Sequence, residues 1–383
     1  VDYMKQAAKK SYGKKGDAVV QMNWKAIDAG VDAVHKVEVP ASWSNPEPDA
    51  PAKELKGPAP LVKMVRDVME PVSRMDGDSL PVSAFAHNPN GEWELGASAY
   101  EKRGTAVMVP EWDAGKCIQC NNCAFVCSHA TIRPFCLTAD ELAAAPASLK
   151  SADTKPKASE YKFTIAVSPL DCMGCGECVT VCPTKAIEMK PQESQSAQQA
   201  AFDYCVENIR KKPGMMAETT VKGSQFNQPL LEFSGSCAGC AETSYARLIT
   251  QLFGEKMFIS NATGCSSIWG GTASVSPYTT NKESGCGPAW NNSLFEDNAE
   301  HGLGMQIGYE TIRANLINKV VALKGKNADL DATIDKFLET KNNTKANDAP
   351  AKALIAALEA CGCDEAKEIL KDKQYLAKKS FWI

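Results

Sequence analysis

Two runs of four cysteines carry the clearest chemical signal in this sequence. The first run is Cys117-Ile-Gln-Cys120-Asn-Asn-Cys123-Ala-Phe-Val-Cys127, and the second is Cys172-Met-Gly-Cys175-Gly-Glu-Cys178-Val-Thr-Val-Cys182-Pro183. In this spacing three neighbouring thiolates bind one iron–sulfur cluster, and the fourth binds the cluster of the other run. The spacing therefore predicts two [4Fe–4S] clusters.

The predicted ligands form two sets. One set is Cys117, Cys120, Cys123 and Cys182, and the other is Cys172, Cys175, Cys178 and Cys127. Zinc is the alternative, but a zinc ribbon uses two Cys-x-x-Cys pairs per metal and leaves the other cysteines of each run without a role. The two runs resemble those of two-cluster ferredoxins. Ser128-His129 follows Cys127 where that motif usually has proline, and we expect His129 to be a loop or surface residue.

A third set consists of Cys237-Ala-Gly-Cys240 and the more distant Cys265. Three cysteines are one short of a [4Fe–4S] cluster, so spacing alone leaves a zinc site or a redox-silent group of buried thiols open. The remaining cysteines have no partner at a metal-binding spacing, and we expect buried structural thiols. These are Cys136, Cys205, Cys286, Cys361 and Cys363.

Length and composition limit the class of protein. The chain has 383 residues, 44% of them apolar, which is enough for two or three domains with their own cores. The formal net charge of -4 gives no electrostatic reason to expect nucleic acid or an anionic membrane as a partner. We find no apolar run of membrane-spanning length and no leader pattern, and the first residue is Val1 rather than Met.

The elements around the cysteines are predicted from periodicity and breakers. Prolines between residues 40 and 60 predict a linker, and helices are expected at 61–72 and 245–253. A strand is expected at 184–189, after the last ferredoxin-type cysteine. From residue 215, short apolar runs alternate with glycine-rich turns, which is typical of an α/β domain. The chain from residue 304 is expected to be mainly helical, and 380–383 is expected to be a core strand.

Several longer sequence segments resemble one enzyme family. They are Ser11–Gly16, Tyr100–Gly104, Gly235–Thr243, Asn261–Gly271 and Gly287–Glu300. These segments are similar to pyruvate:ferredoxin (flavodoxin) oxidoreductase. They occur in the same order as in that family and cover essentially the whole chain. The last three are similar to the start of its thiamine diphosphate domain.

The resemblance implies a fold and further ligands. The fold class is α/β multidomain with an inserted α+β two-[4Fe–4S] ferredoxin-like domain. The domains would be 1–45 (end of a coenzyme A-side α/β domain), 46–95 (linker or small domain), 96–205 (ferredoxin-like) and 206–383 (start of the thiamine diphosphate domain). Cys237, Cys240 and Cys265 would bind a third [4Fe–4S] cluster, and Glu242 and Cys265 would contact thiamine diphosphate. The fourth ligand of that cluster and most Mg²⁺ ligands would lie beyond residue 383, in the remainder of the same polypeptide.

The implied activity is oxidative decarboxylation of pyruvate with coenzyme A, in which three clusters pass electrons singly to ferredoxin or flavodoxin. The resemblance also implies a homodimer, which we expect in an anaerobe's cytoplasm or, alternatively, in a hydrogenosome-like organelle. Another 2-oxoacid:ferredoxin oxidoreductase and a pure electron-transfer subunit with two clusters are the alternatives.

The residues around the two cysteine runs differ. Because Asn121 and Asn122 lie in one cysteine run and Gly174 and Gly176 lie in the other, we expect the two clusters to differ in reduction potential.

Overall fold

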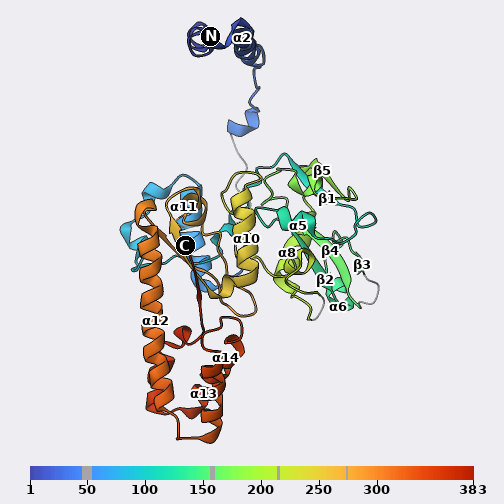
Figure 1. The fold of residues 1–383 in the computed structure, drawn as a ribbon. Helices are drawn as coiled ribbons and strands as arrows, with labels where there is room; N and C mark the ends of the chain where they lie inside the picture. The colour runs from blue at the N-terminus through green and yellow to red at the C-terminus, as the bar shows by residue number, and fades with distance from the viewer. Residues whose placement is uncertain (45–53, 156–159, 214–215, 273–274) are drawn as a thin grey trace. The chain divides into compact units, whose positions relative to one another are not determined.

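A computed structural model describes residues 1–44, 54–155, 160–213, 216–272 and 275–383 (Figure 1). The chain separates into two units, Val1–Leu55 and Lys56–Ile383. The first unit contains α1 (Asp2–Tyr12) and α2 (Asp17–Asp32), and the indole Nε1 of Trp24 donates to the Lys5 carbonyl at 2.9 Å. Much of the predicted proline-rich linker lies outside the described residues.

The second unit begins with a continuous helical segment. It comprises α3 (Ala59–Met64), a π-helical turn (Val65–Met69) and α4 (Glu70–Ser73), which confirms the helix predicted at 61–72. Met64 and Val65 are fully buried on its inner face. Short 3-10 turns then lead to Tyr100 and the segment that precedes the first cysteines.

The eight cysteines of the two runs lie in a module of two small antiparallel sheets. Its strands are β1 (Met108–Trp112), β2 (Ile132–Leu137), β3 (Ala152–Asp153), β4 (Lys162–Val167) and β5 (Ile187–Pro191). Strand β1 pairs with β5, and the other sheet has the order β2-β4-β3. The helices are α5 (Asn122–Val126), α6 (Ala139–Ala143), α7 (Glu177–Thr180) and α8 (Gln198–Asn208). The strand predicted at 184–189 is found as β5, a few residues later.

The core of this module contains cysteines that were predicted as ligands. Trp112 and Phe163 pack edge to face, with ring centroids 6.0 Å apart, and Cys123 and Cys178 belong to the same buried cluster. The apolar residues of β1, β2, β4 and β5 therefore enclose the positions where clusters are expected.

A three-stranded parallel sheet follows. Strands β6 (Met257–Ala262), β7 (Ala289–Ser293) and β8 (Ser380–Trp382) have the order β7-β6-β8. Helices α9 (Val221–Ser224), α10 (Ala241–Phe253) and α11 (Cys265–Gly270) accompany them. The predictions of a helix at 245–253, a strand near 380 and an α/β texture are confirmed.

The C-terminal part is helical, as predicted. Helix α12 (Asn298–Ala322) is followed by α13 (Ala328–Thr340), α14 (Asp348–Cys361) and α15 (Asp364–Leu370). Figure 1 shows α13 and α14 beside the end of α12 that is distant from the sheet. Val320, Ile334, Phe337 and Leu354 form the centre of their shared core. No helix in the described part of the chain is both long enough and apolar enough to cross a membrane.

Candidate metal centres

The two cysteine runs fold into loops with the same backbone pattern. In the first run, Gln119 and Asn121 have φ of 61° and 63°, and the corresponding residues of the second run, Gly174 and Gly176, have φ of 70° and 78°. Left-handed backbone costs least for glycine. Gln119 holds its conformation through its side-chain amide, which donates to Asp153 O at 2.7 Å and accepts from Lys155 N at 2.8 Å.

The first predicted ligand set lines one small cavity. Its lining includes the following residues: Trp112, Cys117, Ile118, Cys120, Cys123, Ile165, Cys182 and Ile187. Burial raises the pKa of the Cys123 thiol, and negative charge on Cys117, Cys120 and Cys182 raises it further. The four sulfurs therefore share one apolar cavity although Cys182 comes from the other run.

The second predicted set is joined by the same kind of electrostatic contact. Burial raises the pKa of Cys172 to about 12, and the Cys127 and Cys175 thiolates add to this effect. The pKa of Cys178 is likewise raised, first by burial and then by its neighbours Cys127, Cys123 and Cys172. Cys127 thus lies among the cysteines of the second run, as the crossed assignment requires.

The donor atoms around these thiols suit an iron–sulfur cluster. Backbone N–H groups donate to sulfur in both sets: Gln119 to Cys117 at 3.3 Å, Ala186 to Cys182 at 3.1 Å, Gly174 to Cys172 at 3.4 Å and Thr131 to Cys127 at 3.4 Å. Buried thiolates repel one another and need cationic metal to remain ionised. No three His, Cys, Asp or Glu side chains among the described residues converge closely enough for a single metal ion. Buried cysteine sulfurs that accept backbone N–H bonds are the environment of an iron–sulfur cluster.

The third predicted set is more open. Cys237 and Cys265 are exposed and Cys240 is half-buried, and no contact among the described residues joins the Cys265 thiol to the other two. Cys265 is the first residue of α11, beyond the carboxyl end of β6. Glu242 is exposed in the first turn of α10 and has no described contact with Cys265.

The Cys237–Cys240 loop nevertheless shares a feature with the ferredoxin-type loops. Gly239 has φ of 72°, close to the value at Gly174, which occupies the same place in its own Cys-x-x-Cys step. A methyl group on Gly239 would lie 3.6 Å from the Cβ of Cys175 and 3.7 Å from an oxygen of Glu177. The Cys237–Cys240 loop is therefore next to the second set.

The segment Glu101-Lys102-Arg103 connects the second and third sets. Lys102 Nζ pairs with Asp171, which directly precedes Cys172, at 2.6 Å, and it lies 4.9 Å from the ring centre of Phe233. Arg103 donates to the carbonyl of Ser234, at 3.3 Å, in the segment that leads to Cys237. One short segment thus contacts the approaches to two cysteine loops.

His129 was expected to be a loop or surface residue. It lies in a turn, which agrees with the first alternative, but it is only 3% exposed and so is not at the surface. Its Nε2 is 3.0 Å from the Ser236 carbonyl oxygen, which only accepts, so Nε2 carries the proton and Nδ1 accepts from Ser128 Oγ at 3.0 Å. His129 therefore joins the turn after Cys127 to the residue before Cys237. Sequence spacing gives no sign of this contact.

The remaining cysteines divide into two groups. Cys136 and Cys205 are buried, as predicted, but Cys286 and Cys361 are exposed and Cys363 is half-buried. The prediction fails for these three because their turns and helix ends lie at the surface. Cys361 and Cys363 place their sulfurs 2.8 Å apart.

Polar residues meet at the carboxyl ends of β6 and β7. Asn292 Oδ1 accepts from Asn261 Nδ2 at 2.9 Å and from Ser267 Oγ at 2.8 Å, and Ser267 Oγ accepts from Gly264 N at 3.0 Å. Ligands of parallel α/β sheets bind at this end of the strands. The network orders the turn that presents Cys265.

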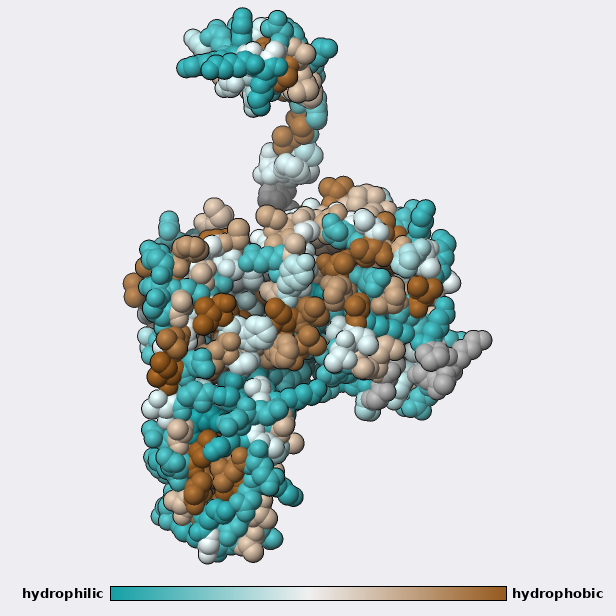
Figure 2. All heavy atoms as spheres, in the orientation of Figure 1, coloured by the Kyte–Doolittle hydropathy of each residue, from teal (hydrophilic) through white to brown (hydrophobic). Residues whose placement is uncertain are grey.

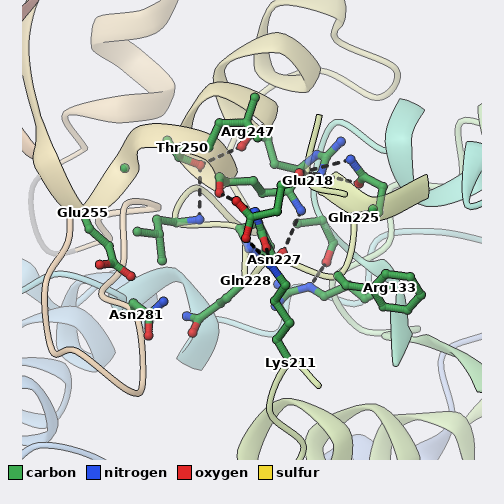
Figure 3. Close-up of a pocket in the computed structure, with 18 of the residues that line it drawn as sticks. Arg133, Lys211, Glu218, Gln225, Asn227, Gln228, Arg247, Thr250, Glu255 and Asn281 are labelled. Atoms are coloured by element: carbon green, nitrogen blue, oxygen red, sulfur yellow. Dashed lines mark hydrogen bonds and ion pairs between the residues drawn. The ribbon is translucent and has the colours of Figure 1, made fainter. Parts of the chain in front are cut away.

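A larger cavity of about 720 Å³ lies elsewhere in the second unit (Figure 3). Arg133, Lys211, Gln225, Asn227 and Arg247 are among its lining residues, and none of the predicted ligands lines it. Its position reflects the packing of α9 and α10 against the ferredoxin-type module.

The fold and the eight gathered cysteines define an iron–sulfur protein of the two-cluster type. Residues 116–186 match the 4Fe-4S dicluster domain family. Residues 50–106 match the EKR family, a domain of unknown function, which includes Glu101-Lys102-Arg103.

The relatives identify the family. A pyruvate-flavodoxin oxidoreductase of Klebsiella pneumoniae is 45% identical over 100% of this chain and 32% of its own length. A pyruvate:ferredoxin oxidoreductase of Moorella thermoacetica is 43% identical over 100% of this chain and 33% of its own length. A pyruvate dehydrogenase [NADP(+)] of Cryptosporidium parvum is 45% identical over 82% of this chain and 17% of its own length. The chain belongs to the pyruvate:ferredoxin (flavodoxin) oxidoreductase family and spans about a third of the length of the first two relatives.

Proposed function

We propose that this chain supplies the electron-transfer module and part of the thiamine diphosphate domain of an oxidoreductase. The proposed enzyme converts pyruvate and coenzyme A to acetyl-CoA, CO₂, a proton and two electrons. Similarity to pyruvate oxidoreductases along the whole chain carries the proposal. The names of these relatives agree on pyruvate and differ in the acceptor, so ferredoxin or flavodoxin is proposed as the class of acceptor.

Thiamine diphosphate, with Mg²⁺, supplies the electron sink for decarboxylation of a 2-oxoacid when it is bound. In this chain Glu242 and Cys265 are proposed to contact it. Both are accessible, on the first turns of α10 and α11. The polar network of Asn261, Ser267 and Asn292 would hold the Cys265 turn in place.

The cysteine loops support an order of electron transfer. The Cys237–Cys240 loop packs against Cys175 and Glu177, and Cys123 and Cys178 lie within electrostatic reach of each other. We therefore propose that electrons pass from the third set to the set of Cys172 and then to the set of Cys117. Ile118, which is 47% exposed, marks the surface next to the last set.

The chain's remaining predicted partners belong to the same proposal. Leu303, Ile307 and Ile312 are exposed apolar residues on α12, and Figure 2 shows hydrophobic surface along this helix. Packing against the rest of a longer polypeptide or a second copy would cover them. The cytoplasm of an anaerobe, with an organelle as the alternative, stays a prediction.

The test is an EPR experiment on the anaerobically purified holoprotein. Pyruvate should reduce the iron–sulfur clusters, so that the EPR signals of the reduced clusters appear. Coenzyme A should increase the fraction of clusters that is reduced. 2-Oxoglutarate is the matched control and should have little effect. Clusters that respond to dithionite but not to pyruvate would contradict the proposal, and a response to 2-oxoglutarate alone would favour another 2-oxoacid.

A further inference from the structure

Arg247 is a buried cation between the cysteine loops. It lies on α10, seven residues after Cys240, and is 2% exposed. Its guanidinium donates to Gln225 Oε1 at 3.0 Å, to Gln251 Oε1 at 2.7 Å and to the Phe125 carbonyl at 2.7 Å. Figure 3 shows Arg247 close to Gln225. All three acceptors are neutral, and the buried Nε has no hydrogen-bond partner within the described residues.

A buried positive charge is costly unless a negative charge compensates it. Arg133, which is also buried, pairs with the Glu232 carboxylate. Arg247 forms no ion pair with a carboxylate in the part of the chain that the structure describes. Burial lowers its pKa to about 10, and the Cys127 thiolate opposes that shift. The hydrogen bond to Phe125, two residues before Cys127, fixes the guanidinium beside this loop.

We propose that Arg247 compensates the charge of the cluster that Cys127 binds and thereby raises its reduction potential. This inference rests on the ligand assignment in the proposed function. A four-thiolate cluster gains one negative charge on reduction, and a fixed nearby cation favours that reduced form. Backbone N–H donors to sulfur are alike in the two sets. Arg247 is therefore a charged feature of only one of the two sets, and it would make their potentials differ.

The decisive variant is Arg247→Gln, studied in the anaerobic holoprotein by EPR-monitored redox titration. The equilibrium constant for reduction of one cluster should fall at least tenfold, which lowers its reduction potential by about 59 mV for a one-electron couple. Arg313→Gln is the matched control. Arg313 is also 2% exposed and bonds to neutral acceptors, Leu376 O and Asn347 Oδ1, but no cysteine acts on it. Its replacement should leave the potentials unchanged.

Two further variants separate charge from structure. Arg247→Lys keeps the charge. Its equilibrium constant for cluster reduction should stay within about threefold of the parent value, where a tenfold change corresponds to about 59 mV. Gln225→Glu places a carboxylate beside an intact guanidinium and should lower the same potential. If Arg247→Gln does not assemble clusters, Gln225→Glu decides the question.

Each outcome supports or overturns the inference. Equal potentials in Arg247→Gln and Arg313→Gln would overturn it, as would an equal shift in Arg247→Lys and Arg247→Gln. An unchanged potential in Gln225→Glu would also count against it. Failure of the proposed function has a different signature, because the parent protein would then lack clusters or ignore pyruvate.

Discussion

The ferredoxin-type module and the region of Cys237, Cys240 and Cys265 begin from the same local motif but build different sites. The first Cys-x-x-Cys step of each loop has a left-handed residue before its second cysteine, namely Gln119, Gly174 and Gly239. In the module, a second left-handed residue follows that cysteine and returns the chain toward a third cysteine two residues later. After Cys240 the chain instead enters α10 at once.

This difference bears on where a third ligand for the proposed site of Cys237 and Cys240 would come from. A loop that turns twice collects three thiols from one short segment, whereas a loop that starts a helix collects two and depends on a separate element. The proposed element is α11, which begins with Cys265. The eight cysteines of the module are mostly buried or half-buried, but Cys237 and Cys265 are exposed. The proposed third site would therefore depend on tertiary contacts rather than on local sequence.

The largest effect is expected from removing a ligand in the module. Cys178→Ala should abolish one cluster and lower the thermal stability of the holoprotein, because Cys178 belongs to the buried core and metal binding contributes to folding. Cys237→Ala should leave both module clusters intact. Iron and sulfide analysis with EPR and thermal denaturation would measure this. Equal losses of stability in the two variants would contradict the contrast between the regions.

The next effect concerns the ion pair that supports the second loop. Lys102→Met leaves the Asp171 carboxylate, whose side chain is 2% exposed, without its cation. We expect a loss of about 3 kcal/mol in unfolding free energy, at the low end for a broken buried pair because Lys102 is partly exposed. Chemical denaturation would measure it. Adding Asp171→Asn should recover part of the loss.

The matched control for this pair is Lys150→Met. Lys150 pairs with Glu111 at the surface, where the side chains are 55% and 33% exposed. Its loss should change stability by less than about 1 kcal/mol. Similar effects of Lys102→Met and Lys150→Met would mean that the Glu101-Lys102-Arg103 segment does not support the cysteine loops.

The sequence predicted the module better than the third site for a physical reason. The predicted ligands of the module lie in two short runs, and the spacing within each run predicts which thiols face the same cavity. The helices α10 and α12 and the strand β8 were also predictable, because their periodicity is local. The placement of Cys265 depends on how β6 and β7 end, which no local pattern encodes.

Long-range polar contacts were not predictable from the sequence. His129 is buried through Ser236, 107 residues later, and Arg247 reaches Phe125, 122 residues earlier. A histidine after a cysteine run and an arginine in an amphipathic helix are usually solvent-facing. The same limit applies to Cys286, Cys361 and Cys363, since exposure of a lone thiol is decided by packing.

A smaller effect is expected at the left-handed position that the loops share. Gly174→Ala places a methyl 3.1 Å from the Met108 carbonyl oxygen and 3.3 Å from the Ala106 Cβ, whereas the nearest atom to a methyl at Gly239 is 3.6 Å away. We expect a loss of about 2–3 kcal/mol for Gly174→Ala and about 1 kcal/mol for Gly239→Ala, where only backbone strain remains. Denaturation of the two variants tests this. The reverse order would mean that the third loop is packed more tightly than the structure indicates.

The smallest effect is expected at the second left-handed position, which distinguishes the module from the third site. Asn121 and Gly176 occupy it in the two runs, and a Cβ at Gly176 would meet no atom within 4 Å. Asn121 donates to the Lys222 carbonyl at 2.9 Å. Because asparagine tolerates left-handed backbone, Gly176→Asn and Asn121→Gly should each change the unfolding free energy by no more than about 1 kcal/mol.

Gly176→Val should lower the unfolding free energy more than Gly176→Asn does and should reduce cluster occupancy, since a β-branched residue resists this conformation. Iron content and denaturation of the three variants would measure these effects. If Gly176→Val kept full occupancy, the second turn would not be what lets one loop collect three thiols.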